Sequence, residues 1–232
     1  MTLYVGTSGF SYPKWKPSFY PAELPAKQML RFYAEHFRTV EMNSTFYRLP
    51  TAASVEAWLP HVPAAFRFVL KAPQLITHIR RLNDAADALT AFREVAAVLK
   101  DRLGPLFFQL PPNFKKDVPR LRDFFALLPP DLRTAWEFRH PTWFDDEVYA
   151  LLRQHNAALC IADADDDLEV PYVATADWGY LRLRRESYTT PALKKWVTAV
   201  QDQPWTDTFV FFKHEDTGTG PKFATKFLEL AE

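Results

Sequence analysis

Eight short apolar runs, separated by segments with helical spacing, constrain the fold of this chain more than any other feature. Each run has the length and composition of a buried strand. The runs are Leu3–Thr7, Thr39–Asn43, Phe66–Lys71, Leu106–Leu110, Thr134–Phe138, Ala157–Asp163, Gly179–Arg184 and Thr208–His214. Strands that alternate with helices favour an α/β protein with a parallel sheet.

The intervening segments carry apolar side chains at three- and four-residue steps, which is the spacing of an amphipathic helix. One such segment runs from Leu89 to Leu103, with Asn83 upstream as the expected N-cap. Another follows Asp145, also an expected N-cap. The other helical segments lie around Met29–Phe37, Leu121–Leu128 and Leu193–Val200.

Eight units in 232 residues give 29 residues per unit, which is the size of one (β/α)8 repeat near the lower end of its range. We therefore predict a single TIM-like barrel domain over residues 1–232. A doubly wound open sheet fits less well, because the chain has only 6 glycines and no glycine-rich nucleotide loop. Ala164–Trp178 lacks helical spacing and predicts an irregular connection between strands six and seven.

The amino-acid composition excludes several classes of protein. Lysine plus arginine and aspartate plus glutamate each number 28, so the formal net charge is zero and a globally basic nucleic-acid binder is excluded. The single cysteine, Cys160, leaves no disulfide framework and no thiolate zinc cluster. No signal peptide or membrane span is recognised, so a cytoplasmic protein with no membrane partner is expected. No cofactor and no metal site are predicted.

Polar residues end the apolar runs, at the positions where a barrel of this type carries its chemistry. Alternation along a strand puts Glu41 with Asn43 on one face, Glu137 with Arg139 on one face, and apolar neighbours on the opposite faces. The polar faces are therefore expected to meet at the barrel mouth. These strand-end residues are Ser8, Glu41, Asn43, Lys71, Gln109, Glu137, Arg139, Asp163, Arg182, Arg184 and His214.

The charged strand ends predict an anion site. Four cations (Lys71, Arg139, Arg182 and Arg184) stand against three carboxylates before His214 is considered. Arginine forks hold phosphate or carboxylate groups by paired hydrogen bonds. The alternative interpretation is a buried ion-pair network that only fills the barrel, although so many interior charges are expensive without a function.

Six motifs, spread from Val5 to about Phe227, resemble those of the domain-of-unknown-function 72 family, the YecE-like proteins. They read GTSGF-SYPKW, TVEMNSTFYRLP, FVLKAPQLITH, FFQLPPNF, WEFRHPTWF and YLRLR. The resemblance implies a TIM-like barrel with a groove at its mouth, but it supplies no reaction. The last strand departs from the family pattern, because Lys213, His214, Glu215 and Asp216 stand where many members carry an Asn-Asn pair.

The first functional hypothesis is an enzyme, or a non-catalytic ligand sensor, for a phosphorylated or carboxylated small molecule. Glu41 or Glu137 would be the general base, with Lys71, His78 and Asp163 as the other candidate catalytic residues. A lysine beside several carboxylates should stay protonated and be a poor Schiff-base former. The candidate ligand-binding residues are Ser8, Asn43, Tyr47, Gln109, Arg139, His140, Trp143, Tyr180, Arg182 and Arg184.

The second hypothesis is a nucleic-acid-binding protein, or a DNA-processing protein that resembles endonuclease IV. Trp15, Tyr47, Trp143 and Tyr188 would be its stacking surfaces. A glycoside hydrolase is a third alternative, but Gln109 and arginines stand at the fourth and seventh strands where barrel glycosidases usually carry carboxylates. Substrate, oligomeric state and pathway are left open.

Overall fold

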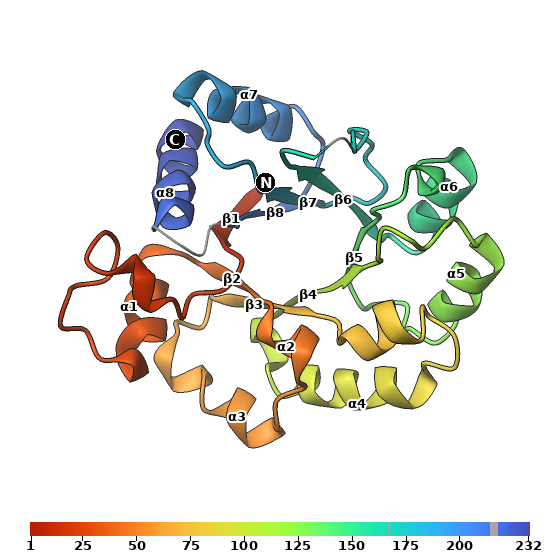
Figure 1. Cartoon of the computed structure of the whole chain (residues 1–232), viewed down its shortest axis with the longest axis horizontal. Helices are drawn as coiled ribbons and strands as arrows, with labels where there is room; N and C mark the ends of the chain where they lie inside the picture. Colours follow the sequence, from red (N-terminus) through yellow and green to blue (C-terminus); the bar gives the residue numbers. More distant parts are fainter. Residues whose placement is uncertain (167, 214–217) are drawn as a thin grey trace.

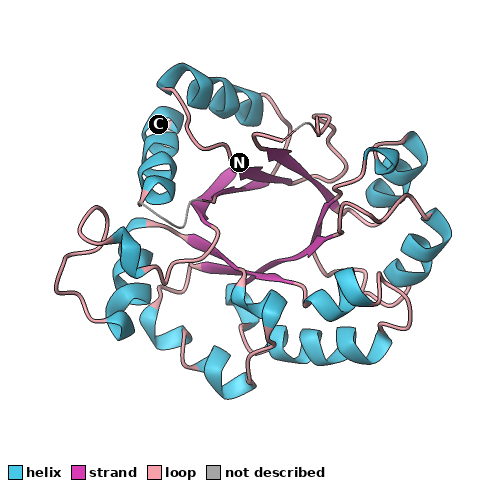
Figure 2. Ribbon diagram, in the orientation of Figure 1, coloured by secondary structure: helices cyan, strands magenta, loops and turns pink. Residues whose placement is uncertain are grey.

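Eight parallel strands form one nearly closed ring, with the helices around it (Figures 1 and 2). The computed structural model describes residues 1–166, 168–213 and 218–232. The hydrogen-bonded order of the strands is β1-β8-β7-β6-β5-β4-β3-β2. The strands are β1 (Thr2–Thr7), β2 (Thr39–Met42), β3 (Arg67–Lys71), β4 (Leu103–Gln109), β5 (Thr134–Glu137), β6 (Ala158–Asp163), β7 (Gly179–Leu183) and β8 (Asp207–Phe212).

The helices cover the outer face of the ring and bury its outward-facing side chains (Figure 2). They are α1 (Met29–His36), α2 (Ser44–Tyr47), α3 (Ala52–Glu56), α4 (Ala86–Ala97), α5 (Val118–Phe125), α6 (Asp146–Gln154), α7 (Thr190–Gln201) and α8 (Thr219–Ala231). The described part of the chain contains no helix that is both long and apolar enough to cross a bilayer. The predicted single (β/α)8 TIM-like barrel is confirmed.

Helix boundaries partly follow the predicted signals. The Asp145 carboxylate accepts a 3.0 Å hydrogen bond from the Glu147 amide and caps α6, as its sequence position predicts. The prediction for α4 was wrong at both ends, because its N-cap is Ala85, not Asn83, and Leu103 belongs to β4. Lys100 has a left-handed φ of 50°, so the chain leaves the helical path before Leu103 while the apolar spacing happens to continue.

The connection from β6 to β7 has neither helix nor strand in its described residues, as the sequence predicts. Thr175 fixes this connection to the barrel. Its hydroxyl donates to the Ala157 carbonyl and accepts from the Leu159 amide, both at 2.7 Å. These two bonds satisfy backbone groups at the start of β6 and hold the connection against the strand.

The ring closes through a short contact between β1 and β2. An isolated bridge joins Ser8 to Glu41, and the Gly9 amide donates to the Glu41 carbonyl at 2.8 Å. Gly6 allows this approach, because a Cβ there would overlap the Thr39 carbonyl oxygen and the Tyr33 hydroxyl. The closure therefore depends on the absence of a side chain at one buried position.

We expect Gly6→Ala to lower the free energy of unfolding by about 1–3 kcal/mol, because backbone must move to admit the methyl group. Urea denaturation followed by tryptophan fluorescence measures the change. Gly104→Ala is the matched control, since a Cβ there meets its nearest neighbour, the Val69 side chain, at 3.1 Å. An equal loss in the two variants would contradict the role of Gly6 in closure.

Two layers of inward-facing side chains fill the barrel. The lower layer is aromatic and includes Phe107, Tyr180 and Phe209, with Phe107 and Tyr180 stacked at 5.1 Å between ring centroids. On β4 and β7 the residues two positions further along, Gln109 and Arg182, form a polar layer above, whereas Phe211 on β8 stays in the aromatic cluster. Period-two alternation thus places a charged layer on an aromatic floor, nearer the carboxyl ends of the strands.

Candidate functional site

Arg182 is the centre of the polar layer. Its guanidinium donates to Glu137 Oε2 at 2.6 Å and to Glu41 Oε1 at 2.9 Å, and it lies 4.8 Å from the centroid of the Phe107 ring. The three charged side chains are 2% exposed or less. The predicted convergence of residues from β2, β5 and β7 is therefore observed, but as a buried ion-pair network below the mouth.

The two carboxylates are saturated with donors. Glu41 accepts from Ser8 Oγ at 2.7 Å and from the Tyr180 hydroxyl at 2.5 Å in addition to Arg182. Glu137 Oε1 accepts from Gln109 Nε2 at 2.8 Å. Carboxylates held in this way have little capacity to take a proton from a substrate, so the geometry disfavours either one as a general base.

Electrostatics supports the same interpretation of Glu137. Burial by itself would raise the pKa of its carboxyl, but Arg182, Arg139 and Arg184 together hold that pKa well below its usual range. Burial also disfavours the Arg182 charge, yet Glu41 and Glu137 keep the pKa of its guanidinium above the usual value. Both groups therefore remain ionised at neutral pH, as structural charges.

Lys71, at the end of β3, is bound differently from the arginines. Its Nζ donates to Gln109 Oε1 at 2.9 Å and lies 4.2 Å from the centroid of the Phe46 ring. No ion pair of Lys71 occurs among the described residues, because arginines hold both nearby carboxylates. Burial, and then the Arg182 charge, lower the pKa of the Lys71 amine to about 7.

His78 contacts the same Phe46 ring as Lys71, with 4.8 Å between ring centroids. It lies in a short π-helical turn, Leu75–Ile79, where the sequence predicted a loop. Its Nδ1 pairs with the Thr77 hydroxyl at 2.9 Å. Burial, and then the Lys71 charge, lower the pKa of His78 to about 4, so its ring is neutral at physiological pH.

Arg139 and Arg184 lie on the open side of the network, above Glu137. Arg139 Nε donates to Glu137 Oε1 at 2.8 Å. Arg184 makes longer contacts: its Nη2 lies 3.8 Å from the same Glu137 oxygen and 3.9 Å from Asp166 Oδ2. Their side chains are 32% and 16% exposed. Arg184 Nε is buried and has no hydrogen-bond partner among the described residues, so part of its donor capacity is unused.

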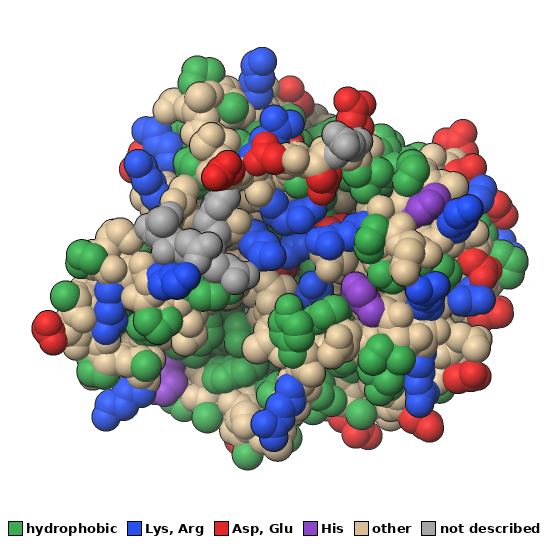
Figure 3. All heavy atoms as spheres, viewed as in Figure 1, with side chains coloured by type: hydrophobic (Ala, Val, Ile, Leu, Met, Phe, Trp, Pro, Cys, Tyr) green, Lys and Arg blue, Asp and Glu red, His purple; other side chains and the backbone are tan. Residues whose placement is uncertain are grey.

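A cavity of about 270 Å³ adjoins these arginines. It is lined by Glu137, Arg139 and Arg184 together with residues of the β6–β7 connection, among them Asp166 and Leu168. Figure 3 shows lysine and arginine side chains gathered over the centre of the ring, with acidic side chains along the upper side of this cluster. The mouth therefore presents positive charge to a ligand that enters from this face.

Other predicted site residues lie outside this cluster. Asp163 pairs with Arg185 at 2.6 Å, and the His140 ring caps a turn by bonding Thr142. Trp143 is completely buried and donates to the Phe114 carbonyl at 2.6 Å, so it packs in the core and not in the predicted mouth wall. His214 lies outside the described residues.

Exposure separates the remaining candidates. Tyr47 is 75% exposed, whereas the predicted stacking residues Trp15 and Tyr188 are buried, and so is the predicted ligand-binding residue Tyr180, which lies below the network. Asn43 Oδ1 is buried without a hydrogen-bond partner among the described residues. Phe46 was missed as a site residue, although it lies in the motif that contains Asn43 and Tyr47; only the fold shows its ring beside Lys71.

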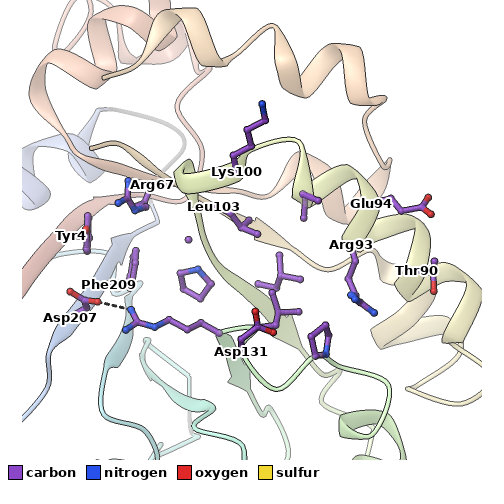
Figure 4. A pocket seen from close by; sticks show the side chains of 18 residues that line it. Tyr4, Arg67, Thr90, Arg93, Glu94, Lys100, Leu103, Asp131, Asp207 and Phe209 are labelled. Atoms are coloured by element: carbon purple, nitrogen blue, oxygen red, sulfur yellow. Dashed lines mark hydrogen bonds and ion pairs between the residues drawn. The ribbon is translucent and has the colours of Figure 1, made fainter. Parts of the chain in front are cut away.

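A second cavity, of about 800 Å³, lies at the opposite end of the barrel (Figure 4). Its walls include the first residues of β3, β4 and β8, namely Arg67, Leu103 and Asp207. Asp207 pairs with Arg133 at 2.5 Å, and Arg67 donates to two backbone carbonyls. Because these cations are already bound and this end of a barrel serves stability, we place the candidate site at the other mouth.

Potential metal ligands are dispersed in the part of the chain that the structure describes, where no three His, Cys, Asp or Glu side chains form a group that could hold an ion. Cys160 is buried, 3.9 Å from Glu137 Oε2. Burial, and then the Glu137 charge, raise the pKa of its thiol well above the usual value. The described site therefore offers arginine, lysine and amide groups for ligand contact.

These observations define a class of protein: a (β/α)8 TIM-like barrel whose polar cluster lies at the carboxyl ends of the strands. A family model described as "Protein of unknown function DUF72" matches residues 4–232. The chain belongs to the DUF72 family, and the resemblance of its six motifs is confirmed.

Solved structures support the same assignment. A crystal structure of a DUF72 family protein from Thermotoga maritima is 28% identical, covers 99% of both chains and superposes with a TM-score of 0.83. A DUF72 family protein from Enterococcus faecalis, 20% identical, covers 99% of this chain and 95% of its own, with a TM-score of 0.81, and shows the shared fold.

Curated relatives match part of their length. The UPF0759 protein YecE of Escherichia coli (strain K12) is 34% identical over 143 residues, which are 61% of this chain and 50% of the relative. The UPF0759 protein YunF of Bacillus subtilis (strain 168) is 29% identical over 156 residues, 63% of this chain and 54% of the relative. The chain spans about half the length of the curated relatives it matches.

Proposed function

We propose that this DUF72 protein is an enzyme or ligand-binding barrel for a small molecule that carries a phosphate or carboxylate group. The anion would bind at the carboxyl-end mouth between Arg139 and Arg184. Ligand sites in barrels of this class lie at that end, and arginine is the side chain best suited to bidentate anion contacts. A cavity of about 270 Å³ suits a small ligand and excludes a large one.

One observation carries the proposal: the arginines at the open side of the network share one carboxylate, and part of their donor capacity is unused. Glu137 is shared by Arg139, Arg182 and Arg184, and the Nε donor of Arg184 has no hydrogen-bond partner among the described residues. An anion bound there would receive unused donors. Within this proposal Glu41 and Glu137 orient the cations and do not accept substrate protons.

The experiment is a calorimetric titration with inorganic phosphate. We expect Arg139→Met and Arg184→Met each to weaken binding by about tenfold to a hundredfold, since a hydrogen bond to a charged group contributes about 1.5–3 kcal/mol. Arg93→Met is the matched control, because Arg93 lines the cavity at the opposite end and should leave affinity unchanged. Unchanged affinity in both mouth variants would refute the proposed site.

A nucleic acid is the second candidate ligand, and the exposed Tyr47 ring favours it. Tyr47 follows β2 and is 75% exposed, so a base could stack on it. A single-stranded oligonucleotide titrated at two salt concentrations tests this candidate. Salt-dependent binding that is lost in Tyr47→Ala would support nucleic acid over the small anion, whereas no binding would remove this second candidate.

A further inference from the structure

Lys71 is the one described member of the charged layer that has a neutral hydrogen-bond partner and no ion pair. The carbonyl oxygen of the Gln109 amide accepts from Nζ at 2.9 Å, and the amide nitrogen of the same side chain donates to Glu137. Gln109 therefore separates the amine from the carboxylate. A carboxylate bonded directly to Lys71 would stabilise the protonated amine and raise its pKa. A neutral amide stabilises the protonated amine much less.

The surroundings of Lys71 also disfavour its charged form. The residue is 9% exposed, it packs against the Phe46 ring, and the Arg182 guanidinium belongs to the same layer. Desolvation and a neighbouring cation are the two devices that make a lysine nucleophilic in enzymes. With a pKa near 7, a large fraction of the amine is unprotonated at neutral pH.

We propose that Lys71 is a covalent nucleophile that forms a Schiff base with an aldehyde or ketone bearing a phosphate or carboxylate group. This proposal rests on the proposed function and names its substrate class. Arg139 and Arg184 would hold the anionic end of the substrate, and Lys71 would attack the carbonyl end. Hydrogen bonds of 2.8–2.9 Å connect Arg139 to Lys71 through Glu137 and Gln109, so both cationic groups belong to one network.

Formation of the Schiff base consumes the neutral amine, the carbonyl group and one proton, and it releases water. The Nζ lone pair of the neutral amine forms a bond to the carbonyl carbon, and the π electrons of C=O move to oxygen. The oxygen takes one proton from the amine and one from solvent and leaves as water, which yields the protonated imine. Solvent carries the amine proton to oxygen, and the Phe46 ring, which lies 4.2 Å from Nζ, keeps the amine partly desolvated.

Reductive trapping tests the proposal. The folded protein is incubated with glycolaldehyde phosphate and sodium cyanoborohydride, and labelled lysines are located by peptide mass spectrometry. We expect Lys71 to be labelled faster than the exposed Lys195 of α7 by on the order of tenfold or more, because it is the more deprotonated amine. Its labelling rate should rise through about pH 7 and level off, whereas that of Lys195 should keep rising.

Variants and a second aldehyde separate this proposal from the proposed function. Arg139→Met should slow labelling of Lys71 by glycolaldehyde phosphate and leave labelling by uncharged glycolaldehyde unchanged. Phosphate binding without preferred labelling of Lys71 would overturn the nucleophile and leave the anion site intact. Equal labelling of Lys71 by both aldehydes in the unaltered protein would overturn the anionic substrate class of Lys71, whereas only the phosphate titration decides the anion site itself.

Discussion

Replacing Arg182 with methionine is expected to lower the free energy of unfolding by about 3–5 kcal/mol, the range found when one partner of a buried ion pair is removed. The substitution leaves Glu41 and Glu137 in the barrel interior without the cation that bridges them. Methionine fills much of the same volume, so the loss reports uncompensated charge and not an empty cavity. Urea denaturation at pH 7 measures it.

Two further variants define what that result means. Arg31→Met removes a surface pair with Glu35 at 3.9 Å, whose side chains are 75% and 60% exposed, and should change stability by no more than about 0.5 kcal/mol. The triple variant Arg182→Met, Glu41→Gln, Glu137→Gln should recover part of the loss, because no buried carboxylate is then unpaired, whereas Arg139 and Arg184 lose their contacts with Glu137. A triple variant less stable than Arg182→Met would contradict the electrostatic explanation.

Lys71→Met is expected to make the protein more stable at pH 6, by up to about 5 kcal/mol. The folded state lowers the pKa of this amine from 10.5 to about 7, and each unit corresponds to about 1.4 kcal/mol. Below pH 7 both folded and unfolded chains carry the proton, so folding bears the full penalty of burying it. Between pH 7 and 10.5 the folded chain binds fewer protons, so the penalty decreases and this group makes stability rise with pH.

The measurement is the difference in unfolding free energy between Lys71→Met and the unaltered protein at each pH from 6 to 10. Taking the difference cancels the titration of every other group. We expect it to be largest at pH 6 and to decrease toward zero by about pH 10. Lys195→Met on the exposed face of α7 should show no such dependence. A difference that is constant with pH would mean that Lys71 is charged in the folded state throughout this range.

Period-two alternation made half of the site predictable. Glu41, Glu137 and Arg182 were assigned to the barrel side of their strands because Val40, Trp136 and Leu181 alternate with them, and these apolar neighbours do pack in the core on the helix side. Strand order in a parallel barrel then requires the polar ends to meet at one rim. That part of the argument needed only the regular geometry of strands.

Partner choice was not predictable in the same way. The sequence contains four cations and several carboxylates at one rim, and many pairings are compatible with that inventory. In the folded protein Glu137 is paired with three arginines, and Lys71 donates a hydrogen bond to the Gln109 amide. Asp163 is paired with Arg185 instead of a residue of this network. The expectation that neighbouring carboxylates would hold Lys71 in a salt bridge was wrong for this reason, since no ion pair of Lys71 occurs among the described residues.

By itself the sequence determined the architecture, because the number, period and spacing of its apolar runs are local properties that leave few ways to bury them. It also determined which residue types reach the carboxyl-end rim. Only the tertiary structure decided which of those charged side chains are buried below the rim and which are partly exposed. It also decided that the Lys71 amine has no ion-pair partner within the described part of the chain. These outcomes depend on distances of a few ångströms between side chains from different strands, and desolvation and Coulomb energies change steeply over that range.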